Sequence, residues 1–116
     1  MANSGDKNKL KEIVSLLKAL SNESRLVVMC ALHKGEKSVG ELEQIIGISQ
    51  SALSQHLARL RKDGYVKTRR HAQTIYYSLC DVQATRVFEM ICGLYDVSED
   101  GFSCFGYEAD EAEAGE

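Results

Sequence analysis

Residues 38–64 constrain the fold most strongly, because they encode two short helices separated by only three residues. Ser38 and Glu41 have the spacing of a capping box, so we predict a helix that begins there and is closed by Gly47. Ser49 is a suitable N-cap for a second helix, which we predict to end near Lys62. Two short helices joined by so tight a turn are typical of a helix-turn-helix.

Helical periodicity continues on both sides of this pair. Apolar residues recur at i, i+3 and i+4 through residues 7–20, which predicts a first helix there. Asn22 is a suitable N-cap for a helix that runs to about His33. Asp81 is a suitable N-cap for a last helix that runs to about Tyr95.

Between the fourth and the last helix the pattern changes to one typical of strands. Tyr65–Arg69 and Thr74–Leu79 are rich in β-branched and aromatic residues, which predicts a hairpin with residues 70–73 as its turn. The order of four helices, a hairpin and a helix predicts a mainly α, winged helix-turn-helix domain over residues 1–97.

The charge is distributed unevenly along the chain. The net charge is −3, but eight of the 17 acidic residues lie between Asp96 and Glu116, where there is no Lys or Arg. We therefore interpret residues 98–116 as an acidic, flexible tail. The rest of the chain is positive, and residues 49–79 contain six Lys and Arg against one acid. A local basic excess on an acidic chain favours nucleic acid as the partner.

The predicted helix 49–62 carries its apolar and polar residues on opposite sides. Leu53, Leu57 and Leu60 share one face at about 100° per residue, which predicts that this face packs on the core. A solvated polar face is the alternative interpretation, but the basic hairpin that follows favours double-stranded DNA. The predicted DNA-binding residues are Ser49, Gln50, Ser51, Ser54, Gln55 and Arg59 on the helix and Arg69, Arg70, His71 and Gln73 on the hairpin.

Four segments resemble the ArsR/SmtB family of winged-helix repressors. They are Leu17–Leu26, Ser38–Leu42, Ser49–Leu57 and Thr68–Tyr77. The resemblance implies a homodimer built from the first and last helices, binding to a palindromic operator, and an inducer that lowers the affinity for DNA. It also implies that residues 1–97 serve both DNA binding and dimerisation.

The residues that bind metals in this family are missing from the corresponding positions. One family site places a Cys-x-Cys pair in the third helix, where this chain has residues 38–40 without a thiol. Another site uses Asp and His from the last helix, and residues 81–95 contain no histidine. We therefore expect no metal site and no cofactor.

Cys30 resembles the second-helix cysteine of the sulfide- and redox-responsive branch, which includes biofilm-related repressors and a haemolysin regulator. In that branch its partner thiol lies at a position that corresponds to Asp96, so Cys92 or Cys104 would have to replace it. The resemblance implies a repressor whose operator affinity falls when these thiols are oxidised or persulfidated. The alternatives are a regulator without thiol sensing, like the nodulation-type repressors, or a metal-responsive repressor.

Other classes of function fit the sequence less well. No histidine has an evident Asp or Cys partner and no phosphate-binding glycine loop is present, so we do not expect an enzyme. A winged-helix module that binds only proteins would lack steep salt dependence of nucleic-acid binding. No apolar run approaches the roughly 20 residues of a bilayer span, and no secretory signal is evident, so we expect no membrane partner and a cytoplasmic location.

Overall fold

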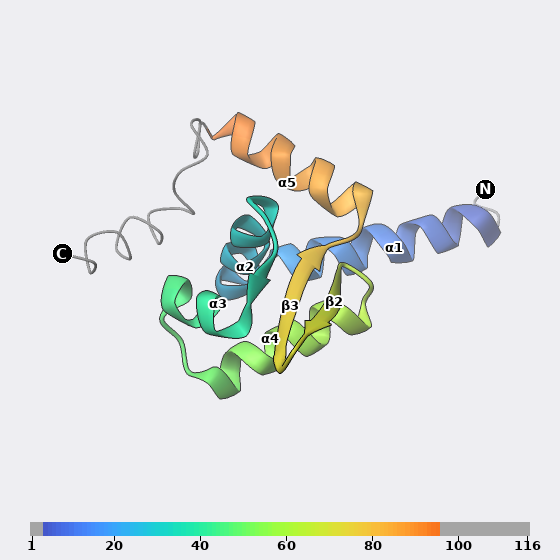
Figure 1. Cartoon of the computed structure of the whole chain (residues 1–116). Helices are drawn as coiled ribbons and strands as arrows, with labels where there is room; N and C mark the ends of the chain where they lie inside the picture. Colours follow the sequence, from blue (N-terminus) through green and yellow to red (C-terminus); the bar gives the residue numbers. More distant parts are fainter. Residues whose placement is uncertain (1–3, 96–116) are drawn as a thin grey trace.

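The computed structural model describes residues 4–95 and has five helices and three short strands in that part of the chain (Figure 1). The helices are α1 (Ser4–Leu20), α2 (Glu23–His33), α3 (Val39–Ile46), α4 (Gln50–Lys62) and α5 (Val82–Leu94). The strands are β1 (Lys37–Ser38), β2 (Val66–His71) and β3 (Thr74–Leu79). The predicted fold class, a mainly α winged helix-turn-helix, is confirmed. The acidic segment 98–116 lies outside the described residues.

The helices begin where the sequence places their caps. The side chain of Asn22 accepts a hydrogen bond from the amide of Arg25 at 3.0 Å at the start of α2. Ser38 and Glu41 form the complete capping box of α3, with hydrogen bonds of 3.2 and 2.8 Å. Asp81 accepts a hydrogen bond from the amide of Ala84 at 2.8 Å at the start of α5.

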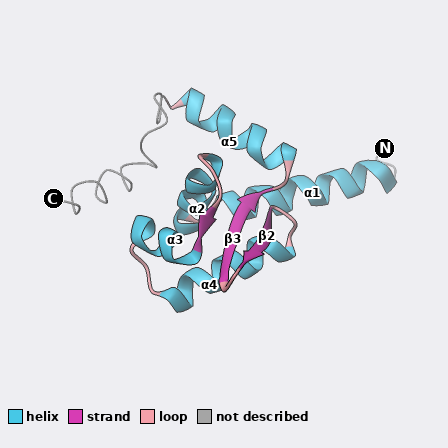
Figure 2. Cartoon of the chain, in the orientation of Figure 1, coloured by secondary structure: helices cyan, strands magenta, loops and turns pink. Residues whose placement is uncertain are grey.

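The sheet is larger than the predicted hairpin, because β1 adds a third strand (Figure 2). The strand order is β1-β3-β2 and both pairings are antiparallel. β1 has only two residues, too few to show a strand pattern in the sequence. The hairpin itself is confirmed, but β2 extends to His71, so the turn consists of Ala72 and Gln73 rather than residues 70–73.

The core lies between α2, α3 and α4. Leu53, Leu57 and Leu60 of α4 are fully buried, as their shared face predicts. α2 supplies six consecutive buried residues, from Val27 to Leu32. The core therefore holds α4 by one face only and leaves the opposite face to solvent.

α1 and α5 have large apolar side chains on the surface. On α1 these are Leu10, Ile13, Val14 and Leu17, which are 41–60% exposed. On α5 they are Val82, Met90 and Leu94, which are 59–74% exposed. Within residues 4–95, no helix is long and apolar enough to cross a membrane.

Candidate nucleic-acid interface

α4 and the β2–β3 hairpin lie on one side of the molecule, and α5 lies on the opposite side (Figure 1). The structure places all ten predicted DNA-binding residues on the exposed surface of these two elements, with Ser49 directly before α4. α4 also contacts β2, so the helix and the hairpin form one continuous surface. This arrangement suits a helix in the major groove with a hairpin reaching the neighbouring backbone.

Ser49 fixes the first turn of α4. Its hydroxyl oxygen accepts a hydrogen bond from the amide of Ala52 at 3.1 Å, and its own backbone is extended. This cap satisfies one of the amides that a helix leaves unpaired at its start. Gln50 and Ser51 follow directly, so their exposed side chains are held at a defined place at the N-terminus of the helix.

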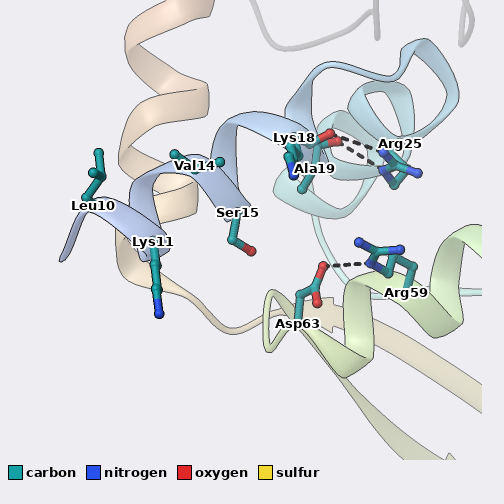
Figure 3. A pocket seen from close by; sticks show the side chains of 9 residues that line it. All are labelled: Leu10, Lys11, Val14, Ser15, Lys18, Ala19, Arg25, Arg59 and Asp63. Carbon is teal, nitrogen blue, oxygen red and sulfur yellow. Dashed lines mark hydrogen bonds and ion pairs between the residues drawn. The ribbon is translucent and has the colours of Figure 1, made fainter. Parts of the chain in front are cut away.

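Arg59, at the other end of α4, is held by an acid of the same helix end. Its Nε donates to the carboxylate of Asp63 at 3.1 Å (Figure 3). Both residues line a pocket of about 430 Å³ between α1, the start of α2 and the end of α4. Arg25 lies on the opposite wall and donates to the carbonyls of Ala19 and Lys18 at the end of α1. Arg59 therefore lies close to α1 across this pocket.

His56 lies on the side of α4 that faces this same region. Its side chain is half-buried between the exposed face and the core. Burial lowers the pKa of His56 below its usual value, and the positive charge of Arg25 lowers it further. Both effects favour the neutral imidazole, so His56 contributes less positive charge to the interface than a solvent-exposed histidine would.

Arg69 is the most tightly held residue of the hairpin. Its Nε and one terminal nitrogen donate to the two carboxylate oxygens of Glu36 at 2.9 and 2.7 Å. Its guanidinium also lies 4.9 Å from the centre of the Tyr76 ring. The hydrogen bond and charge of Arg69 lower the pKa of Glu36 below its usual value. Sequence reasoning missed Glu36, because nothing near it in the chain marks it as a partner of the hairpin.

Arg70 and His71 are exposed near the tip of the hairpin. In the described part of the chain, no ion pair holds Arg70, so its charge is available to a ligand. Gln73 lies in the turn, and Ala72 before it has a φ of +57°, in the left-handed region.

Two of the predicted thiol-switch residues lie on α2 and α5. Cys30 belongs to the buried core and is 2% exposed, whereas Cys92 is half-buried and packs against that core. The two helices are joined where His33 Nε2 meets a carboxylate oxygen of Glu89 at 2.8 Å. The His33 ring also contacts Phe88, with ring centres 5.6 Å apart. Cys104 and Asp96 lie outside the described residues.

The geometry defines a class of protein: a winged helix-turn-helix DNA-binding regulator. Residues 22–68 match the family model described as "Bacterial regulatory protein, arsR family". The chain is 50% identical to the "Transcriptional activator HlyU" of Vibrio cholerae over 90 residues, which cover 78% of this chain and 82% of the relative. It is 44% identical over 88 residues to the "Biofilm growth-associated repressor" of Xylella fastidiosa, covering 76% and 77% of the two chains.

Solved structures show the same likeness. Reduced HlyU from Vibrio cholerae superposes with a TM-score of 0.73 at 47% identity and covers 77% of this chain and 94% of that one. A homodimeric winged helix-turn-helix DNA-binding domain from Mycobacterium bovis superposes with a TM-score of 0.74 at 25% identity, covering 82% and 88%. The chain belongs to the arsR family of bacterial transcription regulators, and it is not an enzyme.

Proposed function

We propose that this regulator is a homodimeric repressor that reads a palindromic operator through α4 and the hairpin. The observation that carries the proposal is the outward face of α4, where the predicted reading residues are all exposed while Leu53, Leu57 and Leu60 hold the helix from behind. Gln and Ser side chains at the start of such a helix can hydrogen-bond to base edges in the major groove. One helix reads only a few base pairs, so two copies are needed for a specific site.

The exposed apolar faces of α1 and α5 support the dimer. Leu10, Ile13 and Leu17 are each more than half exposed on α1, as are Met90 and Leu94 on α5. Apolar patches of this kind on a small domain are typical of an interface. α5 lies on the side of the molecule opposite α4 (Figure 1), and α1 approaches α4 only at its C-terminal end, where Arg59 and Asp63 line the shared pocket. A second copy bound to the apolar faces of α1 and α5 therefore leaves the N-terminal part of α4 open to DNA.

Gln55→Ala tests the reading face. Gln55 is exposed on α4, so we expect the variant to fold normally and to bind the operator about 1–3 kcal/mol more weakly, which is about 5- to 150-fold in Kd. Fluorescence anisotropy with the duplex that the wild-type chain enriches from a random-sequence pool measures this loss. Unchanged affinity of Gln55→Ala and Ser51→Ala for that duplex would exclude this face as the reader.

For the inducer, we propose a thiol reaction that links α2 to α5 or to the C-terminal segment and lowers operator affinity. Cys30 lies three residues before His33, and Cys92 lies three residues after Glu89, so each thiol is about one helical turn from the contact between the two helices. A covalent bond beside this contact would change how α5, and with it the second copy, sits on the body that carries α4.

The chemistry requires an oxidant, and an inorganic polysulfide supplies it. A cysteine thiolate attacks a sulfane sulfur and becomes a persulfide, and a shortened polysulfide leaves. The second thiolate then attacks the cysteine sulfur of the persulfide and forms a disulfide, and hydrosulfide leaves with the electron pair. Cys92 is half-buried and Cys30 is buried, which favours Cys92 as the thiol that reacts first.

Intact-protein mass spectrometry after treatment with reductant, peroxide and polysulfide tests this proposal. We expect a loss of two hydrogens per chain, a peptide linking Cys30 to Cys92 or Cys104, and weaker DNA binding. We expect Cys30→Ser to abolish the response and the control Cys80→Ser to keep it, because the Cys80 thiol is exposed and, among the described residues, donates only to the carbonyl of Gly64. A full response in Cys30→Ser would refute the thiol switch and leave the DNA-binding proposal intact.

A further inference from the structure

The pair between Arg69 and Glu36 spans the whole three-stranded sheet. Arg69 on β2 stands opposite Tyr76 on β3, and Tyr76 stands opposite Ser38 on β1. Glu36 lies two residues before Ser38, where an extended chain returns to the same face. The guanidinium therefore reaches from the outermost strand over the Tyr76 ring to the segment that leads into α3.

Two hydrogen-bond donors of the Arg69 guanidinium are occupied by a carboxylate of the protein itself. Two parallel hydrogen bonds of 2.9 and 2.7 Å join it to the carboxylate, which is the same two-pronged arrangement that an arginine would use for a phosphate. Arg69 cannot hold Glu36 and a phosphate in this two-pronged way at the same time. An aromatic ring below the guanidinium restricts it further, so its position is set by three strands rather than by a free side chain.

Arg70, the next residue, has the opposite placement. Side chains alternate along a strand, so Arg70 shares a face with Val66, which is 2% exposed and packs on the body beside α4. Arg69 points to the other face, with Tyr76 and Glu36. Of the two neighbouring arginines, only Arg70 lies on the face of the hairpin that continues toward α4, and it has no ion-pair partner among residues 4–95.

We propose that Arg69 is a positioning residue, which fixes the hairpin to the segment before α3 through Glu36 and leaves the phosphate contact to Arg70. This inference rests on the proposed DNA-binding function. It predicts that the change in DNA affinity on removing the Glu36 charge has the opposite sign to the one expected from charge alone. Removing the negative charge of Glu36 from a DNA-binding surface should strengthen binding if charge alone mattered. If the pair positions the hairpin, the same change weakens binding.

The test uses the full chain and the duplex that the wild-type chain enriches from a random-sequence pool, with affinity measured over a range of salt concentrations. We expect Glu36→Gln to weaken binding about three- to tenfold, with the same dependence on salt as wild type. Arg69→Lys keeps the charge but loses the two-pronged geometry, so it should weaken binding as much as Arg69→Ala does. Combining Glu36→Gln with Arg69→Ala should weaken binding no further.

Arg70→Ala is the matched control on the same strand. As a phosphate contact it should weaken binding and reduce the slope of log affinity against log salt by about one per hairpin. The exchanged pair Glu36→Arg with Arg69→Glu should recover most of the affinity, because the bridge is restored with its ends reversed. Both pair residues are partly exposed, with side chains 34% and 55% accessible, and a thermal melt of each variant confirms that it is folded.

Three results would overturn the inference. They are Glu36→Gln binding as tightly as wild type or more tightly, Arg69→Lys retaining wild-type affinity, and Arg69→Ala reducing the salt slope as Arg70→Ala does. Failure of the proposed function gives a different result, because the wild-type chain would then enrich no duplex from the pool.

Discussion

Replacing Ser49 with alanine tests how much the N-cap of α4 contributes to the stability of the domain, as distinct from DNA binding by the same helix. The Ser49 hydroxyl accepts one hydrogen bond of 3.1 Å from the amide of Ala52, and alanine leaves that amide without its partner. Loss of an N-cap of this kind costs about 1 kcal/mol per chain, within a range of about 0.5–2. For a domain of this size, 1 kcal/mol lowers Tm by about 4–8 °C. We therefore expect Ser49→Ala to melt several degrees below wild type.

Ser51→Ala is the matched control, because it is the same substitution two residues further along. Ser51 lies inside the first turn of α4 and is exposed, and its side chain makes no hydrogen bond to the described residues. Alanine is the better helix former, so this variant should melt at or slightly above the wild-type temperature. The effect of Ser51→Ala should instead be weaker binding to DNA.

The assay is a thermal melt followed by circular dichroism, with all variants at one protein concentration because a dimer's Tm depends on it. Anisotropy titrations with the enriched duplex accompany the melts. The expected pattern is a lower Tm for Ser49→Ala and weaker binding without a lower Tm for Ser51→Ala. If Ser51→Ala lost as much stability as Ser49→Ala, the helix would not begin at Gln50 as the structure has it.

Two further predictions concern the dimer and the pH dependence. Leu94→Glu places a charge on the exposed end of α5, 74% accessible, and should convert a dimer into monomers in sedimentation; a dimer that persists would place the interface elsewhere. NMR titration should give His56 a pKa below its usual 6.5 in the folded chain. Because the unfolded chain then binds a proton at higher pH than the folded one, His56 contributes stability that is fully present above about pH 6.5 and is lost as the pH falls from there through the lower folded-state pKa. His56→Gln should lack this component.

Much of the fold could be predicted because its signals are local. The four caps at Asn22, Ser38, Ser49 and Asp81 each involve residues three apart in the sequence, so the helix starts were visible without any tertiary information. The core face of α4 follows from the spacing of its leucines. The ends of the hairpin were less visible, because Ala72 occupies a left-handed position where a glycine would have marked the turn.

The parts that escaped prediction depend on residues far apart in the chain. β1 has two residues and exists only because β3 pairs with it from some forty residues away. Glu36 meets Arg69 across 33 residues, and His33 meets Glu89 across 56. No periodicity or motif joins such positions, since each contact is produced by the packing of whole elements.

These long-range pairs change what the basic charge of the surface means. Counting Lys and Arg along residues 49–79 treats six positive charges as equally available to DNA. The structure binds Arg59 to Asp63 and Arg69 to Glu36, so two of the six already have carboxylate partners. To neutralise a phosphate, Arg59 or Arg69 would first have to break its ion pair with the protein. The energy of that ion pair would then be subtracted from the free energy of DNA binding. Local charge identifies the surface that faces DNA, but the contacts of each guanidinium decide which arginines bind it and which hold the surface in shape.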